Sequence, residues 1–305
     1  MRISEINYKI QQIDTSKAGI TYGTSSSVLT NLIKFKNLLN ELEKNELIFY
    51  FDVIKELKSS ELYSTTQDSI VTLASDAALI YSQSKYIVDS IHSLKRVFKE
   101  IIPISKENEL SIKLPNTDNL ENLLKDMSKI EKQLSIVVND SDIQSYIQLS
   151  KWEHGSFWID IIIGTPFAIS VIGAITWSAA YISSQIKKNR EHTLYLEKIE
   201  TEVQMLKSIK EKQEQYLDKL YETEVLNIQE NYFENNENNE RNKKIKDTIK
   251  LFADMIQRGG EFQPSLISPK DIKDSYPDFK NIEYIPSKVQ QISEKPESMN
   301  NQEVI

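Results

Sequence analysis

Residues 161–186 read IIIGTPFAISVIGAITWSAAYISSQI and contain no charged side chain, although 27% of the chain is Asp, Glu, Lys or Arg. A helix that crosses a bilayer needs about 20 predominantly apolar residues. The run therefore predicts one membrane-spanning helix within a hydrophobic segment, residues 156–186. A core helix buried in a soluble bundle gives the same apolar pattern. The length of the run and the polarity of the rest of the chain favour the membrane interpretation.

Small residues recur inside this run, and Ser170, Ala174 and Ser178 follow one another at intervals of four. In lipid, small side chains at this spacing allow two helices to approach closely. We therefore expect the helix to serve in assembly as well as in anchoring. The residues that we assign to the membrane segment are Trp158, Asp160, Gly164, Pro166, Gly173, Ala174, Trp177, Ser178 and Tyr181.

The flanks of the run carry the signals expected at a membrane boundary. Trp and Tyr are enriched where a membrane helix meets the lipid headgroups, and here they lie near both ends of the run. At its start, Asp160 is either a carboxylate at the beginning of the helix or a membrane-buried ion site. Pro166 falls in the first helical turn or kinks it.

Lys187, Lys188 and Arg190 follow the run and predict that the C-terminal side is cytoplasmic. The N-terminus has no apolar segment of the kind found in a signal peptide. The side of the N-terminal domain therefore stays open. Either that domain crosses the membrane, or the run inserts only on activation or assembly.

Residues 1–155 predict a mainly helical domain, or an α+β one. Apolar or small residues recur at alternating steps of three and four over residues 66–102, which indicates a long helix that buries a stripe against another helix. Residues 19–23 and 110–114 predict short strands. Residues 47–51 fit a strand or the start of a helix, and residues 135–149 predict one or two further short strands.

After the run, residues 187–230 predict that the same helix continues as a coiled coil. Its apolar a and d positions are Leu196, Ile199, Val203, Leu206, Leu217 and Leu220, and the polar Lys210 and Gln213 interrupt them. Residues 231–243 form a polar Asn/Glu loop. Residues 244–305 predict a short helix followed by an extended, proline-containing tail. The fold class is therefore mainly α, with a transmembrane-like helix leading into a coiled-coil helix.

The sequence carries no recognisable catalytic pattern. It has no cysteine, and its three histidines, His92, His154 and His192, are not at metal-ligand spacing. Nucleotide-binding glycine motifs, zinc-protease motifs and serine-hydrolase motifs are absent from the sequence. We therefore expect a protein that is not an enzyme and needs no cofactor. The formal net charge of −8 also argues against a nucleic-acid partner.

Three functions fit these features. The first is a single-pass protein of the bacterial cell membrane that acts through homo-oligomerisation, or through a protein partner bound by the N-terminal domain. The second is a pore-forming or membrane-disrupting effector, such as a bacterial toxin or an anti-phage suicide protein. The third is a soluble helical scaffold with a buried central helix. The lipid bilayer is a partner in the first two.

Overall fold

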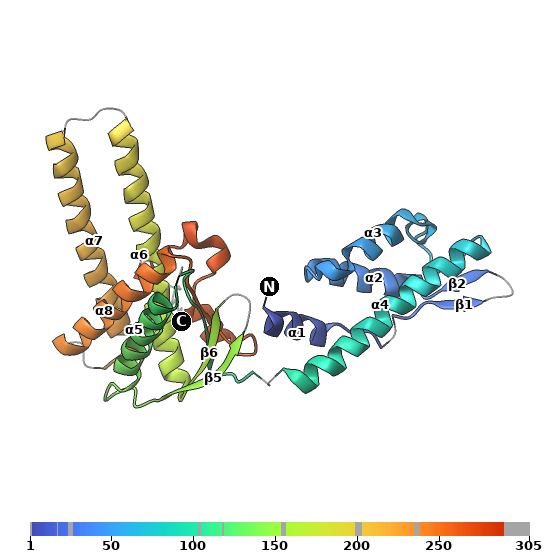
Figure 1. The fold of residues 1–305 in the computed structure, drawn as a ribbon, viewed down its shortest axis with the longest axis horizontal. Coiled ribbons are helices and arrows are strands. Elements are labelled where there is room, and N and C mark those ends of the chain that lie inside the picture. The colour runs from blue at the N-terminus through green and yellow to red at the C-terminus, as the bar shows by residue number, and fades with distance from the viewer. Residues whose placement is uncertain are drawn as a thin grey trace, which may run out of the picture. The chain divides into compact units, whose positions relative to one another are not determined.

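The computed structural model describes residues 2–289, apart from residues 17, 24–26, 103–104, 118, 154–156, 199–202 and 235–237. The fold is mainly helical, with two antiparallel sheets (Figure 1). The chain divides into two compact units, Met1–Ile104 and Ser105–Ile305. Residues 105–155, which we expected in the N-terminal domain, therefore belong to the second unit. Strands from that segment pair with strands further along the chain, and this pairing moves the boundary.

The first unit packs helices around a small antiparallel sheet of order β1-β2-β3. Its elements are α1 (Ile3–Gln12), β1 (Thr21–Gly23), β2 (Val28–Thr30), α2 (Leu32–Lys44), η1 (Ile48–Tyr50), α3 (Phe51–Ser59), η2 (Glu61–Ser64), β3 (Ser69–Val71) and α4 (Ala74–Ile101). The predicted strand at residues 19–23 corresponds to β1. Residues 48–51 are helical, so the segment that we expected to be a strand or the start of a helix is the latter.

Helix α4 matches the long stripe predicted for residues 66–102. Its buried residues, Ala77, Ile80, Ser84, Ile87 and Ile91, follow the expected steps of three and four. The helix begins at Ala74 and not near residue 66, because the preceding residues form β3 and pair with β2. The stripe is buried within the core of this unit.

The second unit is built on a four-stranded antiparallel sheet of order β5-β6-β4-β7. Its strands are β4 (Glu109–Lys113), β5 (Ile147–Glu153), β6 (Trp158–Ile163) and β7 (Glu261–Pro264). Strand β4 confirms the strand predicted at residues 110–114. Leu110 lies opposite Ile161, and Ile112 lies opposite Ile159. Because side chains alternate along a strand, these four point to the same face, and they belong to the core of the unit.

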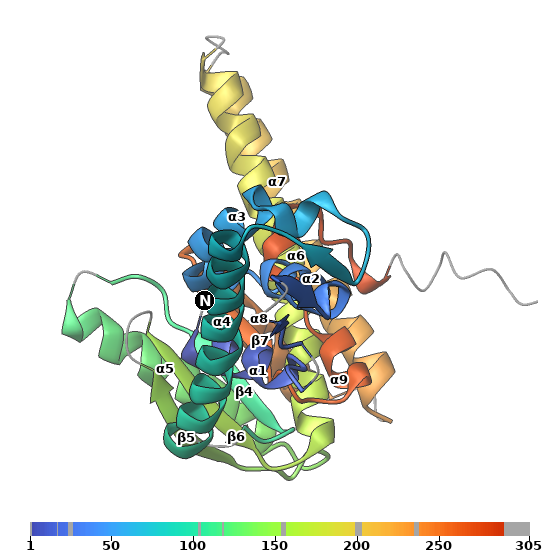
Figure 2. The same ribbon diagram turned by 90° about the vertical axis from the view of Figure 1, so that its right-hand side faces the viewer.

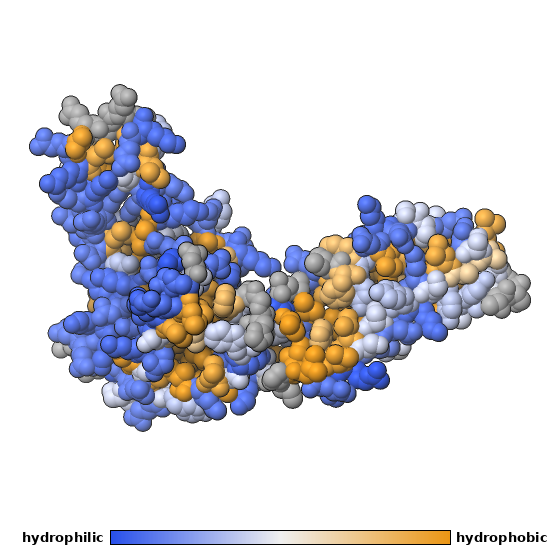
Figure 3. All heavy atoms as spheres, in the orientation of Figure 1, coloured by the Kyte–Doolittle hydropathy of each residue, from blue (hydrophilic) through white to orange (hydrophobic). Residues whose placement is uncertain are grey.

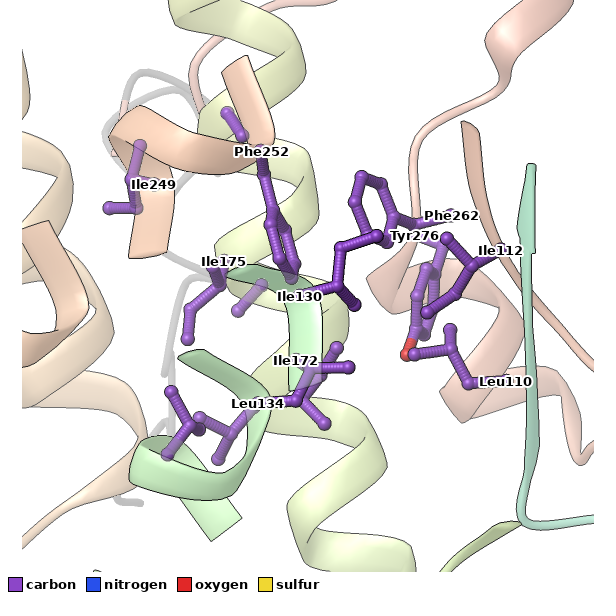
Figure 4. Close-up of a cluster of buried hydrophobic side chains, with 14 of the residues drawn as sticks. Leu110, Ile112, Ile130, Leu134, Ile172, Ile175, Ile249, Phe252, Phe262 and Tyr276 are labelled. Atoms are coloured by element: carbon purple, nitrogen blue, oxygen red, sulfur yellow. The ribbon is translucent and has the colours of Figure 1, made fainter. Parts of the chain in front are cut away.

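Helices supply the rest of this core (Figure 4). They are α5 (Leu120–Val138), α6 (Pro166–Lys198), α7 (Val203–Tyr232), α8 (Asn239–Gln257), α9 (Lys270–Ser275) and the short η3 (Phe279–Tyr284). Residues 135–138, which we expected to lie in a strand, complete α5. Helix α6 contacts α7, α8 and α9 and is the central helix of the unit.

Helices α6 and α7 form an antiparallel hairpin that extends beyond the core, as Figures 1 and 2 show. Cross-links between the arms define the direction: Thr193 pairs with Gln213, and Glu197 pairs with Lys210. The sequence predicted one continuous coiled-coil helix from residue 187 to residue 230. The structure instead divides this segment between two helices, with residues 199–202 outside the described part. The two arms therefore contact each other within one chain.

Candidate functional site: the central helix and the segments that cover it

The uncharged run is divided between a strand and a helix. Residues 161–163 complete β6, in the middle of the sheet, and α6 begins at Pro166. Proline suits the first helical position because it has no N–H to satisfy and its φ is already helical. Thr165 supports this turn, since its Oγ1 accepts a hydrogen bond from the Ala168 amide at 3.2 Å. The expectation that Pro166 lies in the first turn is therefore confirmed.

Gly164 allows this strand-to-helix connection to pass close to a ring. A Cβ atom at this position would lie 2.5 Å from a ring carbon of Tyr146. The glycine is therefore needed for a close approach inside the protein, between the end of β6 and the residues that lead into β5.

Asp160 lies within strand β6, where a sheet pairing holds it, and not at the start of a helix. Its Oδ2 is 3.3 Å from Lys151 Nζ, which is also 3.5 Å from Glu109 Oε2. Both carboxylate side chains are at most 3% exposed. Trp158, on the same strand, is 6% exposed. Asp160 thus shares one buried lysine with a second carboxylate within a sheet, and this position replaces both interpretations drawn from the sequence.

Helix α6 is long and apolar enough to cross a membrane, but 83% of its most apolar window is buried inside the protein. Ala174, Ser178 and Tyr181 are each at most 8% exposed. In Figure 4, Ile172 and Ile175 of this helix lie among core residues from the sheet, α5 and α8. Protein atoms therefore take the place that lipid would take around a membrane helix.

A C-terminal strap, residues 275–289, covers one side of α6. At Gly173, a Cβ atom would lie 2.7 and 2.9 Å from ring carbons of Tyr276 and closer still to Ser275 Oγ. The Tyr276 hydroxyl donates a hydrogen bond of 2.9 Å to the Ile169 carbonyl. Burial raises the pKa of the Tyr276 phenol well above its ordinary value, so this hydroxyl stays protonated and remains a donor.

Trp177 makes the next contact between α6 and the strap. Its Nε1 donates to the Pro286 carbonyl at 2.9 Å, and Lys288 Nζ lies 4.4 Å from the centre of its indole ring. Lys288 also donates to the carbonyls of Asp274 and Ser275. Burial lowers the pKa of Lys288 to about 8, because the charged ammonium loses much of its hydration. An indole that the sequence assigned to a membrane interface therefore anchors the strap.

A buried carboxylate joins three segments of the unit. Glu224 of α7 is 1% exposed. Its Oε2 accepts from the Ser178 hydroxyl of α6 at 2.7 Å, and its Oε1 accepts from the Ser287 hydroxyl of the strap at 2.6 Å. Hydrogen bonds to a charged acceptor are stronger than those between neutral groups. This network therefore ties the small-residue face of α6 to both of its neighbours.

The predicted coiled-coil residues lie on the hairpin arms. Leu196, Leu206, Leu217 and Leu220 are half-buried along the seam between the arms, whereas Val203 is 83% exposed. Ile199 lies outside the described residues. Polar contacts interrupt the seam, because Thr193 Oγ1 donates to Gln213 Oε1 at 3.1 Å. The seam thus closes within one chain, and its apolar residues stay partly accessible.

Four residues of this site were not predicted from the sequence: Glu224, Tyr276, Ser287 and Lys288. One signal was available for Glu224, which falls at helical spacing among Tyr221, Val225 and Ile228, all buried. A carboxylate on the apolar stripe of a helix predicts a buried partner. The strap residues carry no comparable pattern, because their role depends on long-range contacts.

Comparisons with known proteins add one relative. The chain is similar to the uncharacterized protein YqaP of Bacillus subtilis (strain 168), at 27% identity over 299 residues. The alignment covers 93% of this chain and 94% of that protein, so it spans both compact units. No family model and no solved structure matches the chain. Among the described residues, no group of three or more His, Asp or Glu side chains is arranged to hold a metal ion.

Proposed function

We propose that the protein is a non-enzymatic helical scaffold that acts by binding partners, with its apolar central helix serving as an internal support. The observation that carries this proposal is the burial of α6 among α7, α8, the sheet and the C-terminal strap. Of the three functions that the sequence allowed, the scaffold with a buried central helix fits this packing best.

The packing of α6 contributes a large share of the stability of the second unit in water. Five large apolar residues of α6 are fully buried: Ile169, Val171, Ile172, Ile175 and Ile182. Burial of one such side chain contributes about 1.5–3 kcal/mol, so the five contribute about 8–15 kcal/mol. The total stability of a domain is about 5–15 kcal/mol. Lipid would give the side chains of α6 a similar gain, but the residues of α8, α5 and the sheet that pack against α6 would then be exposed.

The hairpin is the surface that we propose for partner binding or homo-oligomerisation. Apolar residues remain exposed toward the far ends of its arms, among them Leu194 and Tyr195 at 49% and 62% and Val203 and Met205 at 83% and 58%. Figure 3 shows apolar residues near this end of an otherwise hydrophilic hairpin. A second helical surface placed here would cover them. The N-terminal unit remains a second candidate for binding a protein partner.

Fractionation and solution behaviour test the proposal. The full-length protein should stay in the supernatant after a carbonate wash of cell membranes, and it should elute as one discrete species in buffer without detergent. Retention in the carbonate-washed membranes, together with aggregation in detergent-free buffer, would reject the scaffold.

A membrane-active state is the second candidate, and the length and hydropathy of α6 favour it. In this state the strap would leave α6, and the helix would enter the bacterial cell membrane as a single span or as part of a pore, with the C-terminal part in the cytoplasm. Release of a trapped dye from anionic liposomes measures this activity. Leakage that rises when the strap contacts are removed supports this candidate, and intact liposomes at every protein concentration exclude it.

A further inference from the structure

A cleft in the second unit lies between α6, the end of α8 and η3 of the strap. Its volume is about 590 Å³. Cavities that bind small molecules typically measure about 300–1,000 Å³. All the segments that line it belong to one compact unit, so its shape does not depend on the other unit.

The floor of the cleft is apolar and continuous with the core. Ile186 of α6, Ile256 of α8 and Ile282 of η3 line it. Ile256 is 6% exposed and belongs to the buried core, and the other two pack against that core from its edge. This floor favours the apolar part of a ligand.

Basic side chains outnumber acidic ones on the rim of the cleft, where Glu191 and Glu283 are the two carboxylates. The rim carries Lys187, Lys188 and Arg190 from one turn of α6. Lys187 forms an ion pair with Glu283 of the strap. This carboxylate partly neutralises the charge of Lys187. No ion pair of Lys188 or Arg190 is found within the described part of the chain, and both side chains are exposed.

We propose that this cleft binds a small amphiphile with a phosphate head, which goes beyond the proposed scaffold function. The phosphate would contact Lys188 and Arg190, and the apolar part would lie on Ile186, Ile256 and Ile282. An arginine and a lysine together offer two positive charges and several N–H donors, which suit the charge and the oxygens of a phosphate. The strap residue Ile282 would contact the ligand directly, so occupancy would hold the strap on α6.

Titration calorimetry with the full-length protein tests the cleft. The probe is dihexanoyl-phosphatidylglycerol below its micelle concentration, and inorganic phosphate is measured in parallel. We expect saturable binding of the lipid with one site per chain and much weaker binding of phosphate. The double variant Lys188→Ala/Arg190→Ala should weaken lipid binding about tenfold or more, since hydrogen bonds to charged groups are lost.

The matched control is Lys207→Ala/Lys212→Ala, which removes two exposed lysines from α7 on the hairpin. This control should bind the lipid like the natural chain. An equal loss in both double variants would show non-specific charge attraction and overturn the proposal. Equal affinity for inorganic phosphate would remove the role of the apolar floor and overturn it too.

Vesicles separate a soluble ligand from a bilayer surface. Phosphatidylglycerol vesicles are compared with phosphatidylcholine vesicles in a flotation assay. Binding to the anionic vesicles without any binding of the short-chain lipid would assign the basic rim to surface adhesion, and it would overturn the cleft. Absence of binding to every probe would overturn it as well.

Discussion

Substitution of Gly173 by alanine tests whether the strap packs on α6. A Cβ atom here would lie 2.7 and 2.9 Å from ring carbons of Tyr276 and closer still to Ser275 Oγ. The ring cannot move aside freely, because Tyr276 is 5% exposed and its hydroxyl bonds to Ile169. Alanine improves helix propensity by about 0.5–1 kcal/mol. Overpacking costs about 1–3 kcal/mol, and loss of the buried hydrogen bond adds about 1–3 kcal/mol. We therefore expect a net loss of about 1–5 kcal/mol.

Tryptophan fluorescence during urea unfolding measures this loss. Trp152, Trp158 and Trp177 are the three tryptophans of the chain, and all lie in the second unit, so the signal follows that unit alone. The urea midpoint of Gly173→Ala should fall by about 0.3–2.5 M, given a slope of about 2–3 kcal/mol per molar. The control is Glu230→Ala, an exposed position of α7 in the same unit that adds no atom against the strap. An unchanged or higher midpoint for Gly173→Ala would refute the packing of the strap on the helix.

Three further predictions concern buried charge, pH and the hairpin. Glu224→Ala should lower the stability of the second unit by about 2–4 kcal/mol, because two buried hydroxyls lose a charged acceptor, whereas the exposed Glu230→Ala should change it by less than about 0.5 kcal/mol in the same urea assay. The pKa of Lys288 is about 8 in the folded protein and 10.5 in its ordinary state. The unfolded chain therefore binds more protons between these values, and stability from this group should rise with pH from about 8 to 10.5. Urea midpoints at pH 7.5 and 9.5 should show this rise, and Lys288→Met should flatten it; an identical slope in the variant would contradict the assignment. Leu194→Asp/Tyr195→Asp should abolish homo-oligomers in light scattering without changing the urea midpoint, and an unchanged mass would exclude this part of the hairpin as the assembly surface.

The sequence predicted local structure better than the environment of that structure. The stripe of α4 and the strand β4 follow from periodicity, because each pattern sets which face of its own segment is apolar. The turn at Pro166 likewise depends on the chemistry of one residue. These features need no knowledge of distant parts of the chain.

The surroundings of α6 could not be predicted from the uncharged residues 161–186 alone. An uncharged helix is compatible with lipid and with protein, and the choice depends on what covers it. Here the cover includes Tyr276 and Ser287, about a hundred residues further along the chain. The hairpin shows the same limit, since an a/d pattern fits a partner helix from another chain and from the same chain equally well.

The strand position of Asp160 has a different cause. A carboxylate before an apolar run fits a helix start, but pairing with Lys151 and the neighbouring strand β4 places it inside a sheet. Tertiary pairing overrides local preference in such short apolar segments. The spacing of Glu224 could have predicted one residue of the site, because it places a carboxylate on the buried stripe of α7.

Hydrogen exchange along α6 tests the central claim most directly. The full-length protein is exchanged in plain buffer, and the amides of residues 168–184 are followed by mass spectrometry with and without anionic liposomes. The account predicts strong protection in buffer alone, at the level of global unfolding of the second unit, with little change on adding lipid. Rapid exchange in buffer, with protection appearing only when liposomes are present, would contradict it.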